Sequence, residues 1–303
     1  MNCSRLVTLG ACKAVLKAIT NPGMDSNDGC FRPLSVVLPP GTVFSAERPA
    51  PVSYYLESFA YAIDLVWHAL APVLPERLTA GNYTSCCATL LTGVDSRNGK
   101  LFVDMQGYCG GWGAGAHQDG QSGLTAPTNG DFYNIPVEVI ERKLPLRVEA
   151  YRLNTGTGGG AGRRRGGFGL VREYRILSDQ ASVFSSCSGW QRRPWGVAGG
   201  DPGSNNYVEA FSADGYVQHG RLSDVRLRRG DVVRVVTGCG GGYGDALGRE
   251  PELVLDDWRN GYVTLEEAER DYAVIIDGAA RAIDAQATRA RRGAAEPAGG
   301  RER

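Results

Sequence analysis

Hydrophobic residues recur at helical spacing in two segments of the N-terminal half of the chain. In the first segment, Ser4–Thr20, they form one face of a helix that Pro22 terminates. In the second, Ser53–Leu74, they cover a wide face, as in a helix packed into a core, and Pro75 follows. We therefore predict two amphipathic helices that bury their apolar faces against the rest of the protein.

A third helix is predicted near the C-terminus. Thr264 and Glu267 have the spacing of a capping box, in which each side chain binds the backbone N–H of the other residue. The apolar positions that follow predict a helix through Ile276 and as far as Ala287. Residues 288–303 are polar, small and without a pattern, which predicts a disordered tail.

Several segments outside these helices alternate apolar and polar residues or form short runs bounded by Gly, Pro, Asp and Asn, which predicts β-strands. Asn98 and Gly99 form a hairpin-turn signal between two of these strands. The segment Leu170–Leu177 carries apolar residues on both sides, which predicts a strand packed on both faces or at an edge. The predicted strands are Leu34–Leu38, Tyr83–Thr92, Lys100–Tyr108, Leu146–Leu153, Leu170–Leu177, Ala181–Ser185, Val208–Phe211 and Asp231–Thr237.

These elements predict an α+β fold with a mixed N-terminal half that contains core helices, a β-rich middle and a C-terminal helix. The predicted organisation has an α+β region at residues 1–150, a β-rich region at 151–250, a helical segment at 251–287 and the disordered tail at 288–303. A chain of 303 residues is long enough to bury a sizeable core.

Glycine accounts for 42 residues and is concentrated in three loops, Gly107–Gly123, the Asn154–Ser178 stretch and Gly238–Gly244. Glycine is needed where the backbone adopts a positive φ or approaches another group closely. The glycines on both sides of Arg163–Arg165 therefore predict that these arginines are held on a shaped loop. Three such loops attached to strands predict a cleft.

Composition and charge narrow the functional classes. The chain has 33 basic and 33 acidic residues, and a formal charge of zero argues against a general nucleic-acid binder. No apolar run reaches the roughly 18 residues of a membrane span, and the N-terminus lacks the features of a signal peptide, so we expect no membrane partner and a cytoplasmic location. Eight cysteines without a CxxC pair predict buried free thiols.

His117 and Asp119 are a closely spaced histidine and carboxylate in the first glycine-rich loop. Imidazole and carboxylate groups both relay protons and bind metals, so the two residues are candidate catalytic groups. A pair is not a metal site, because catalytic zinc usually takes three protein ligands, and His68, His117 and His219 lie in different predicted elements. The metal ligands, if any, stay unknown from the sequence.

Arg163, Arg164 and Arg165 are candidates for binding an anionic or phosphorylated group. The alternative is that they form surface ion pairs with the abundant acidic residues. The sequence contains no GxxxxGK[ST] phosphate loop, no GxSxG nucleophile elbow and no HExxH zinc motif. We therefore predict that this chain itself binds no nucleotide cofactor.

The Arg/Gly stretch AGRRRGGFGLVREYRIL resembles a signature of the hydantoinase B/5-oxoprolinase family, which also includes subunits of acetone and acetophenone carboxylases. Other stretches resemble family segments in the same order and together cover about Ser4 to Ile276. They are NDGCFRPLSVVLPPGTVF (Asn27–Phe44), GGWGAGAHQDGQSG (Gly110–Gly123), NIPVEVIERKLPLRVEAYRL (Asn134–Leu153), RRPWGVAGGDPG (Arg192–Gly203) and GCGGGYGDALGREPELVLDDWRNGYVTLEEAERDY (Gly238–Tyr272).

The resemblance implies an ATP-dependent enzyme that opens a cyclic amide such as hydantoin or 5-oxoproline. In the family, a companion A-type subunit with an actin-like fold handles ATP and magnesium, and the B-type part carries the later chemistry, commonly with a divalent metal. This chain resembles the C-terminal half of a B-type subunit. The family's NDPxxGGxHxxD segment, which resembles its metal site, lies in the N-terminal half, so we expect an N-terminal B-type fragment as a second partner.

The resemblance also implies site residues. Asp119 matches the DG dipeptide of the family loop, whereas His117 matches no invariant family position. Gly241, Gly242, Tyr243 and Asp245 match the family's GGGGYGDP segment, and we predict that they bind the substrate or an intermediate together with the three arginines. Cys239 and Ala246 replace the family's glycine and proline, which predicts a less rigid loop.

Two other functions stay open. The chain could belong to a ketone carboxylase subunit of the same family, or it could be a non-catalytic assembly module or the product of a truncated gene. The family motifs do not distinguish hydantoin, oxoproline, another lactam or a ketone as the small-molecule partner.

Overall fold

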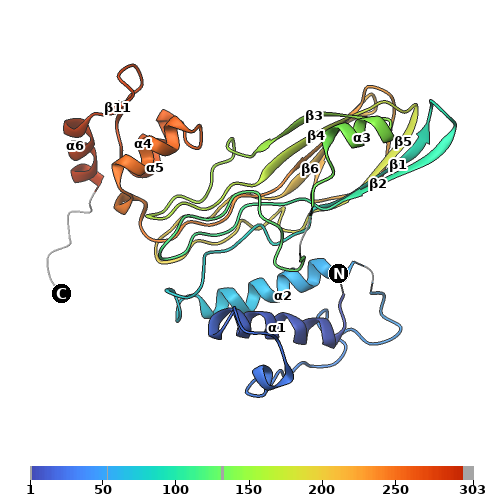
Figure 1. Cartoon of the computed structure of the whole chain (residues 1–303), viewed down its shortest axis with the longest axis horizontal. Helices are drawn as coiled ribbons and strands as arrows, with labels where there is room; N and C mark the ends of the chain where they lie inside the picture. Colours follow the sequence, from blue (N-terminus) through green and yellow to red (C-terminus); the bar gives the residue numbers. More distant parts are fainter. Residues whose placement is uncertain (1, 53, 131–132, 296–303) are drawn as a thin grey trace.

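The computed structural model describes residues 2–52, 54–130 and 133–295, which form three parts (Figure 1). Two long helices lie beside each other, two antiparallel β-sheets lie next to them, and short helices near the C-terminus occupy the opposite end of the molecule. Extended segments run between the sheets and the short helices. The α+β fold class predicted from the sequence is confirmed.

Helix α1 (Arg5–Thr20) and helix α2 (Tyr55–Leu70) are the two predicted amphipathic helices. They pack through a small apolar cluster that includes Ala11 and Val15 of α1 and Ile63 of α2. Helix α2 is shorter than the predicted segment, of which Ser53 lies outside the described residues. The small side chains in this cluster allow the two helices to approach closely.

A buried carboxylate attaches α2 to the sheets. Glu57 accepts hydrogen bonds from the Ser85 hydroxyl (3.1 and 3.0 Å) and from the backbone N–H of Cys86 (3.1 Å). Burial raises the pKa of Glu57, although these hydrogen bonds act in the opposite direction. The helical pair is therefore joined to the sheets by a specific polar contact as well as by apolar packing.

The predicted strand Leu34–Leu38 is wrong. This segment follows the short helix η1 (Asp28–Phe31) and has no regular structure, and no strand of the described residues pairs with it. Pro33 and Pro39 flank it, and proline lacks the N–H group that a β-ladder needs. Alternating apolar residues were therefore not sufficient evidence for a strand.

The strands form two antiparallel sheets, with the orders β2-β1-β5-β8 and β3-β4-β9-β6-β7. The first contains β1 (Ala88–Asp95), β2 (Lys100–Gln106), β5 (Gln180–Ser186) and β8 (Arg221–Leu227). The second contains β3 (Leu146–Leu153), β4 (Leu170–Ile176), β6 (Tyr207–Ser212), β7 (Gly215–His219) and β9 (Val232–Val236), and the short helix α3 (Val137–Lys143) precedes β3. One core cluster between the sheets includes Leu91 and Phe102 of the first and Tyr174 and Val233 of the second.

The β1–β2 hairpin confirms the Asn-Gly turn signal, because Asp95 pairs with Lys100 and Gly99 has a φ of 71°. Strand β1 begins later than predicted. Thr84 and Cys87 have φ values of 50° and 45°, which interrupt an extended strand before Ala88. Strands β7 and β8 were not predicted.

The segment Gly238–Gly244 lies at the centre of the glycine-rich loops. It belongs to no sheet, and its successive N–H groups donate to different neighbouring segments. The donated bonds are Gly240 to Gly167 (2.8 Å), Gly241 to Gly81 (2.9 Å) and Gly242 to Asp201 (2.9 Å). We call this assembly the glycine bundle.

Glycine is required in the bundle because backbones contact one another directly. A Cβ atom on Gly166 would overlap the carbonyl oxygen of Gly240, and one on Gly241 would overlap that of Trp195. Cys239, which was expected to loosen the loop, is fully buried, and its Sγ lies 3.3 Å from the carbonyl oxygen of Asn154, to which it donates. The cysteine therefore fills space at one position of the bundle.

The C-terminal region contains three short helices instead of one long one: α4 (Pro251–Arg259), α5 (Leu265–Tyr272) and α6 (Ala285–Ala295). The capping box of Thr264 and Glu267 is confirmed at the start of α5. The predicted continuation to Ala287 is wrong, because Ala273 adopts a left-handed conformation (φ 50°, ψ 40°) that ends the helix. The short strands β10 (Ile276–Asp277) and β11 (Ala282–Ile283) follow.

Helix α6 corrects the predicted disordered tail over residues 288–295. The Asp284 carboxylate accepts hydrogen bonds from the N–H groups of Gln286 (3.0 Å) and Ala287 (2.9 Å). Arg292 donates to the carbonyl oxygens of Arg249 (2.7 Å) and Tyr272 (3.2 Å), so the helix is attached to its neighbours. The rest of the predicted tail, residues 296–303, lies outside the described residues.

Two expectations from composition bear on the environment of the protein. Within the part of the chain that the structure describes, no helix is long and apolar enough to cross a bilayer.

All eight cysteines are free thiols and six of them are buried, which agrees with the predicted buried thiols for most of the set.

A buried ion-pair network joins the first glycine-rich loop to α4. Arg249 is buried and binds both carboxylate oxygens of Asp119 (2.8 Å each) and one of Asp257 (2.7 Å). Arg165 is also buried, contacts Asp257 at 3.3 Å and donates its backbone N–H to Asp119 (2.8 Å). Its guanidinium lies over the ring of Phe168. We call these four charged residues the loop–helix network.

Burial acts to raise the pKa of Asp119, but the hydrogen bonds and charge of Arg249 outweigh it and lower the pKa below its usual value. Burial likewise acts to lower the pKa of Arg249, whereas the hydrogen bonds to Asp119 and the charges of Asp257 and Asp119 raise it. Asp119 and Arg249 are therefore both charged at neutral pH, and their charges compensate each other.

The bundle predicts that Gly166→Ala lowers the free energy of unfolding by about 3 kcal/mol, because the added methyl group collides with the backbone at Gly240. Gly156→Ala is the matched control in the same loop, since a Cβ there meets no atom within 4 Å, and its effect should stay below about 1 kcal/mol. Urea unfolding of both variants measures the difference. Equal destabilisation would show that the bundle tolerates side chains.

The loop–helix network predicts that Asp119→Asn lowers the free energy of unfolding by about 2 kcal/mol at pH 7, because charged hydrogen bonds to a buried guanidinium are lost. A carboxyl group with a lowered folded pKa stabilises the protein above its unfolded pKa of about 4 and loses this contribution as the pH falls further. The difference from the wild type should therefore shrink below about pH 4 in urea unfolding. Glu252→Gln, at an exposed position of α4, is the control. A pH-independent difference would contradict this assignment.

Candidate functional site

An open cavity of about 380 Å³ lies where the first glycine-rich loop, the arginine loop and the start of α4 meet. Its lining brings together three of the residues predicted from the sequence, His117, Arg163 and Arg164. The remaining lining residues are Ala116, Gly248, Glu250 and Leu253. We call it the arginine cavity, and it is the candidate functional site.

The backbone of the bundle positions both arginines. Arg164 exchanges two backbone hydrogen bonds with Tyr243 (2.9 Å each), and the N–H of Arg163 donates to the carbonyl oxygen of Gly244 (3.1 Å). Gly244 has a φ of 73°, a conformation that glycine adopts without strain, and this allows the chain to turn beside Arg163. The two guanidinium groups are therefore presented from a rigid backbone.

The two arginines differ in exposure. Arg163 is exposed, whereas Arg164 is partly buried and its Nε atom is buried without a hydrogen-bond acceptor among the described residues. A buried donor without an acceptor costs free energy unless a ligand or water satisfies it. The guanidinium of Arg164 is therefore suited to binding an anionic oxygen.

His117 lies at the outer side of the cavity. Its side chain is 81% exposed, and its Nε2 lies 3.5 Å from an Oε2 of Glu76, which is also exposed. Exposed pairs of this kind contribute little to stability. The imidazole is therefore free to contact a molecule that enters the cavity, and the Glu76 carboxylate lies close enough to orient it.

The predicted pair of His117 and Asp119 does not act as a pair in the structure. Asp119 points to Arg249 in the loop–helix network, while His117 faces Glu76 and the cavity. Arg165 also differs from its two neighbours, because its guanidinium is buried against Asp257. Asp119 and Arg165 therefore support the cavity from behind and do not line it.

The family-like segment after β9 also has a supporting place. Gly241 and Gly242 are buried in the bundle, and Tyr243 packs into an apolar cluster with Leu78 and Val197. Asp245 is exposed, and its carboxylate accepts the N–H of Leu247 (3.0 Å) at the start of the short helix η2 (Ala246–Gly248). None of these four residues is among those that line the arginine cavity.

The described residues contain no group of three or more histidine, cysteine, aspartate or glutamate side chains arranged to hold a metal ion. His68 stacks on the ring of Trp195 (4.3 Å between ring centroids), away from His117. His219 lies on β7. A metal held by another polypeptide stays a prediction.

Sequence reasoning missed Glu250 and Leu253 of the cavity and Arg249 of the network. All three lie in the stretch GREPELVLDD, which resembles the family but contains neither a glycine-rich run nor a run of like charges next to them. The one available signal was the charge alternation of Arg249 and Glu250 directly before Pro251, a proline at the first position of a helix.

Comparison with known proteins identifies the family. The family description "Hydantoinase B/oxoprolinase" matches residues 1–246. A protein of Pseudomonas sp. (strain NS671) that is assigned as the B-type subunit of a D-/L-hydantoinase is 34% identical over 257 residues, which cover 82% of this chain and 42% of that protein. The beta subunit of the caprolactamase of Pseudomonas jessenii is 32% identical over 290 residues, which cover 88% of this chain and 48% of that protein. The chain thus spans less than half the length of these two relatives.

Two solved structures have the same fold. An ATP-dependent caprolactamase from Pseudomonas jessenii superposes with a TM-score of 0.80 at 28% identity, over 94% of this chain and 51% of that chain. A nucleotide-free acetone carboxylase superposes with a TM-score of 0.82 at 21% identity, over 97% of this chain and 44% of that chain, and at this identity only the fold is shown. Because the family description covers most of the chain and agrees with these relatives, the protein belongs to the hydantoinase B/oxoprolinase family.

Proposed function

We propose that this chain forms the C-terminal part of a B-type subunit in an ATP-dependent enzyme that opens a cyclic amide by hydrolysis. The observation that carries the proposal is the arginine cavity, which Arg163, Arg164 and His117 line together. Relatives at 32–34% identity are named as a hydantoinase subunit and a caprolactamase subunit, which supports a cyclic amide as the substrate class.

The cavity residues suit a phosphorylated form of the amide. Transfer of the γ-phosphoryl group of ATP to the amide oxygen releases ADP. Attack by one water on the amide carbon then breaks the C–N bond and leaves an acyl phosphate, and a second water hydrolyses this acyl phosphate to the carboxylate and free phosphate. Arg163 and Arg164 would bind the phosphoryl oxygens through charged hydrogen bonds. His117, with Glu76 beside it, is placed to accept a proton from the attacking water.

The remaining components belong to partners in this proposal. The chain has no phosphate loop, so an A-type ATPase subunit supplies ATP and magnesium. Relatives named as B-type or beta subunits support the existence of a companion subunit. An N-terminal B-type fragment completes the subunit and holds the divalent metal, and the cavity residues described here bind and orient the reacting group.

A ketone carboxylase of the same family is the second candidate. It is supported by the fold shared with acetone carboxylase, whose activated ketone would also carry negative charge. The hydrolase is favoured because the relatives with higher identity are named for amide substrates. The third candidate is a non-catalytic assembly module with the same fold. The buried Nε of Arg164 that lacks an acceptor argues against it, because such a module has no use for an unpaired donor.

Arg164→Ala should lower the rate of ATP-coupled lactam hydrolysis about 30–100-fold in the assembled enzyme, because charged hydrogen bonds to the phosphoryl group are lost. Stability should change by less than about 0.5 kcal/mol, since Nε satisfies no acceptor in the folded chain. Arg289→Ala on the exposed surface of α6 is the matched control. A melting temperature that falls sharply while activity per folded molecule is unchanged would show that the loop is structural.

The isolated chain should hydrolyse no ATP and open no lactam, and activity should appear when an A-type subunit and an N-terminal B-type fragment are added. The reason is the missing phosphate loop together with the engagement of the Asp119 carboxylate by Arg249. Phosphate release and ring opening are measured with each component left out in turn. Steady ATP hydrolysis by the chain alone that disappears in the Arg164→Ala variant would contradict the assignment of ATP hydrolysis to the A-type subunit.

A further inference from the structure

The outer face of β2 has the opposite polarity from that expected of a solvent-facing sheet. Phe102, Asp104 and Gln106 point into the core, while Leu101, Val103 and Met105 point outward and are 83%, 64% and 65% exposed. An antiparallel sheet with one solvated face normally carries polar residues on that face. The pattern of β2 is that of a strand covered on both sides.

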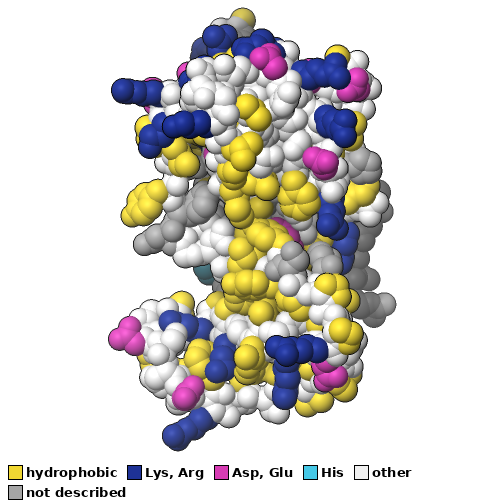
Figure 2. Space-filling view, turned by 90° about the vertical axis from the view of Figure 1, so that its right-hand side faces the viewer, with side chains coloured by type: hydrophobic (Ala, Val, Ile, Leu, Met, Phe, Trp, Pro, Cys, Tyr) yellow, Lys and Arg dark blue, Asp and Glu magenta, His cyan; other side chains and the backbone are white. Residues whose placement is uncertain are grey.

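The apolar face continues across the neighbouring strands. Met105 pairs with Leu90 of β1, which pairs with the partly exposed Phe184 of β5, and Leu101 pairs with Val94. Because paired residues point to the same side, these side chains form rows on one face. Figure 2 shows hydrophobic side chains in a band down the end of the molecule that carries the strands. We call this surface the outer sheet face.

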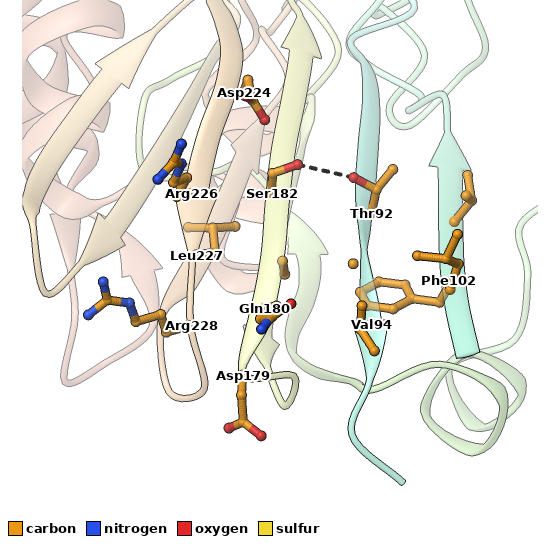
Figure 3. Close-up of a pocket in the computed structure, with 14 residues that line it drawn as sticks. Thr92, Val94, Phe102, Asp179, Gln180, Ser182, Asp224, Arg226, Leu227 and Arg228 are labelled. Carbon is orange, nitrogen blue, oxygen red and sulfur yellow. Dashed lines mark hydrogen bonds between the residues drawn. The ribbon is translucent and has the colours of Figure 1, made fainter. Parts of the chain in front are cut away.

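The outer sheet face is hollowed and has a basic side. A groove of about 570 Å³ runs along it (Figure 3). Apolar side chains that include Val94, Leu101 and Val103 line its β1–β2 side, and the hydroxyl groups of Thr92 and Ser182 share a hydrogen bond (3.1 Å) across its floor. Arg226 and Arg228 lie on one side of the groove, with Asp224 above them in the view. Asp179, which lies near Arg228 in this view, forms an ion pair with Arg229 (2.8 Å). The groove therefore presents more unneutralised positive than negative charge.

Three exposed apolar side chains on one strand, continued by Val94 and Phe184, exceed the scattered exposure of single apolar residues. Four strands with about 4.8 Å spacing and seven residues with about 3.4 Å rise give a face of roughly 19 Å by 24 Å. Exposed apolar patches of a few hundred Å² on soluble proteins mark interaction sites. A concave face is also poorly shaped to pack against an identical concave face, so a convex occupant is favoured over a second copy.

The lengths of the relatives indicate which polypeptide could cover the outer sheet face. This chain matches 42% of the hydantoinase subunit and 48% of the caprolactamase subunit, so each relative carries a further body of comparable size in the same chain. Bodies joined in one chain contact each other through interfaces of about 600–1,500 Å². Such an interface requires an apolar surface on the matched half, and the outer sheet face provides one.

We propose that the outer sheet face is the docking surface for the polypeptide that corresponds to the unmatched half of these relatives. The inference rests on the proposed function, in which that polypeptide is the N-terminal B-type fragment. The occupant presents a convex, helical surface with apolar side chains over Val103 and carboxylates opposite Arg226 and Arg228.

The test uses the full chain and, as the probe, the part of the Pseudomonas jessenii caprolactamase beta subunit that this chain does not match, co-expressed as a separate polypeptide. Val103→Asp should weaken association at least about 30-fold, because it places a charge at the centre of an apolar interface. Arg226→Glu, a change at the groove's basic side, should weaken it about 10-fold. Val73→Asp, at a position 74% exposed and distant in sequence, is the matched control and should bind as the wild type does.

Methionine oxidation locates the contact independently. Met105 lies on the outer sheet face, whereas Met24 lies in the turn after α1 and is 43% exposed. Hydrogen peroxide converts exposed methionine to its sulfoxide, which mass spectrometry measures for each peptide. In the complex, oxidation of Met105 should slow at least about 10-fold, while that of Met24 should not change.

Each outcome decides the proposal. Binding that protects Met105 and is lost in Val103→Asp and Arg226→Glu supports it. The proposal is overturned if the wild-type chain does not bind the probe, if it binds without protecting Met105, or if Met105 becomes protected at high concentration of this chain alone, which would indicate a second copy. If the complex hydrolyses the lactam while Met105 stays unprotected, the docking surface is wrong and the proposed function stands. If Met105 is protected but the complex hydrolyses no lactam, the docking surface stands and the proposed function is wrong.

Discussion

The direct contact between backbones in the glycine bundle is the constraint on which the other features depend. The segment Gly238–Gly244 forms hydrogen bonds with several neighbours and leaves no room for side chains at its closest contacts. Because these neighbours come from distant parts of the sequence, the bundle fixes the relative positions of the first glycine-rich loop and the arginine loop. The arginine cavity exists because these loops are held at a defined distance.

Buried ion pairs add to the backbone contacts in fixing the loops around the arginine cavity. Arg249 lies between Asp119 of the first loop and Asp257 of α4, so one buried side chain connects both walls of the cavity. A buried cation with two carboxylate partners is sensitive to the loss of either partner. The sequence run Arg163–Arg165 therefore contains two kinds of arginine: Arg165 contributes to structure, and its two neighbours are available to a ligand.

The features that the sequence predicted correctly depend on local interactions. The Asn98-Gly99 hairpin and the capping box at Thr264 each involve residues within a few positions of one another. The features that it did not predict depend on distant residues. Arg165 is buried because Asp257, 92 residues away, lies beside it, and nothing in the arginine run distinguishes it from Arg163.

Backbone conformation and context explain other differences. Ala273 ends α5 in a left-handed conformation that alanine rarely adopts, so helix propensity alone favoured a longer helix. Leu34–Leu38 is a short apolar run, but it has no neighbouring strand in the described chain. For the candidate site, the sequence identified three lining residues but also grouped with them Asp119, Arg165 and the bundle glycines, which hold the cavity in place.

The position of the bundle's central segment in the chain has a consequence for the order of folding. Gly238–Gly244 is made after the segments that surround it, yet Gly111 and Gly160 donate their N–H groups to its carbonyl oxygens. During synthesis these groups lack their native partners until the chain has been made as far as Gly240. The glycine-rich loops thus remain hydrated while the β1–β2 hairpin can already form, and the cavity is assembled in a late step that closes long-range contacts.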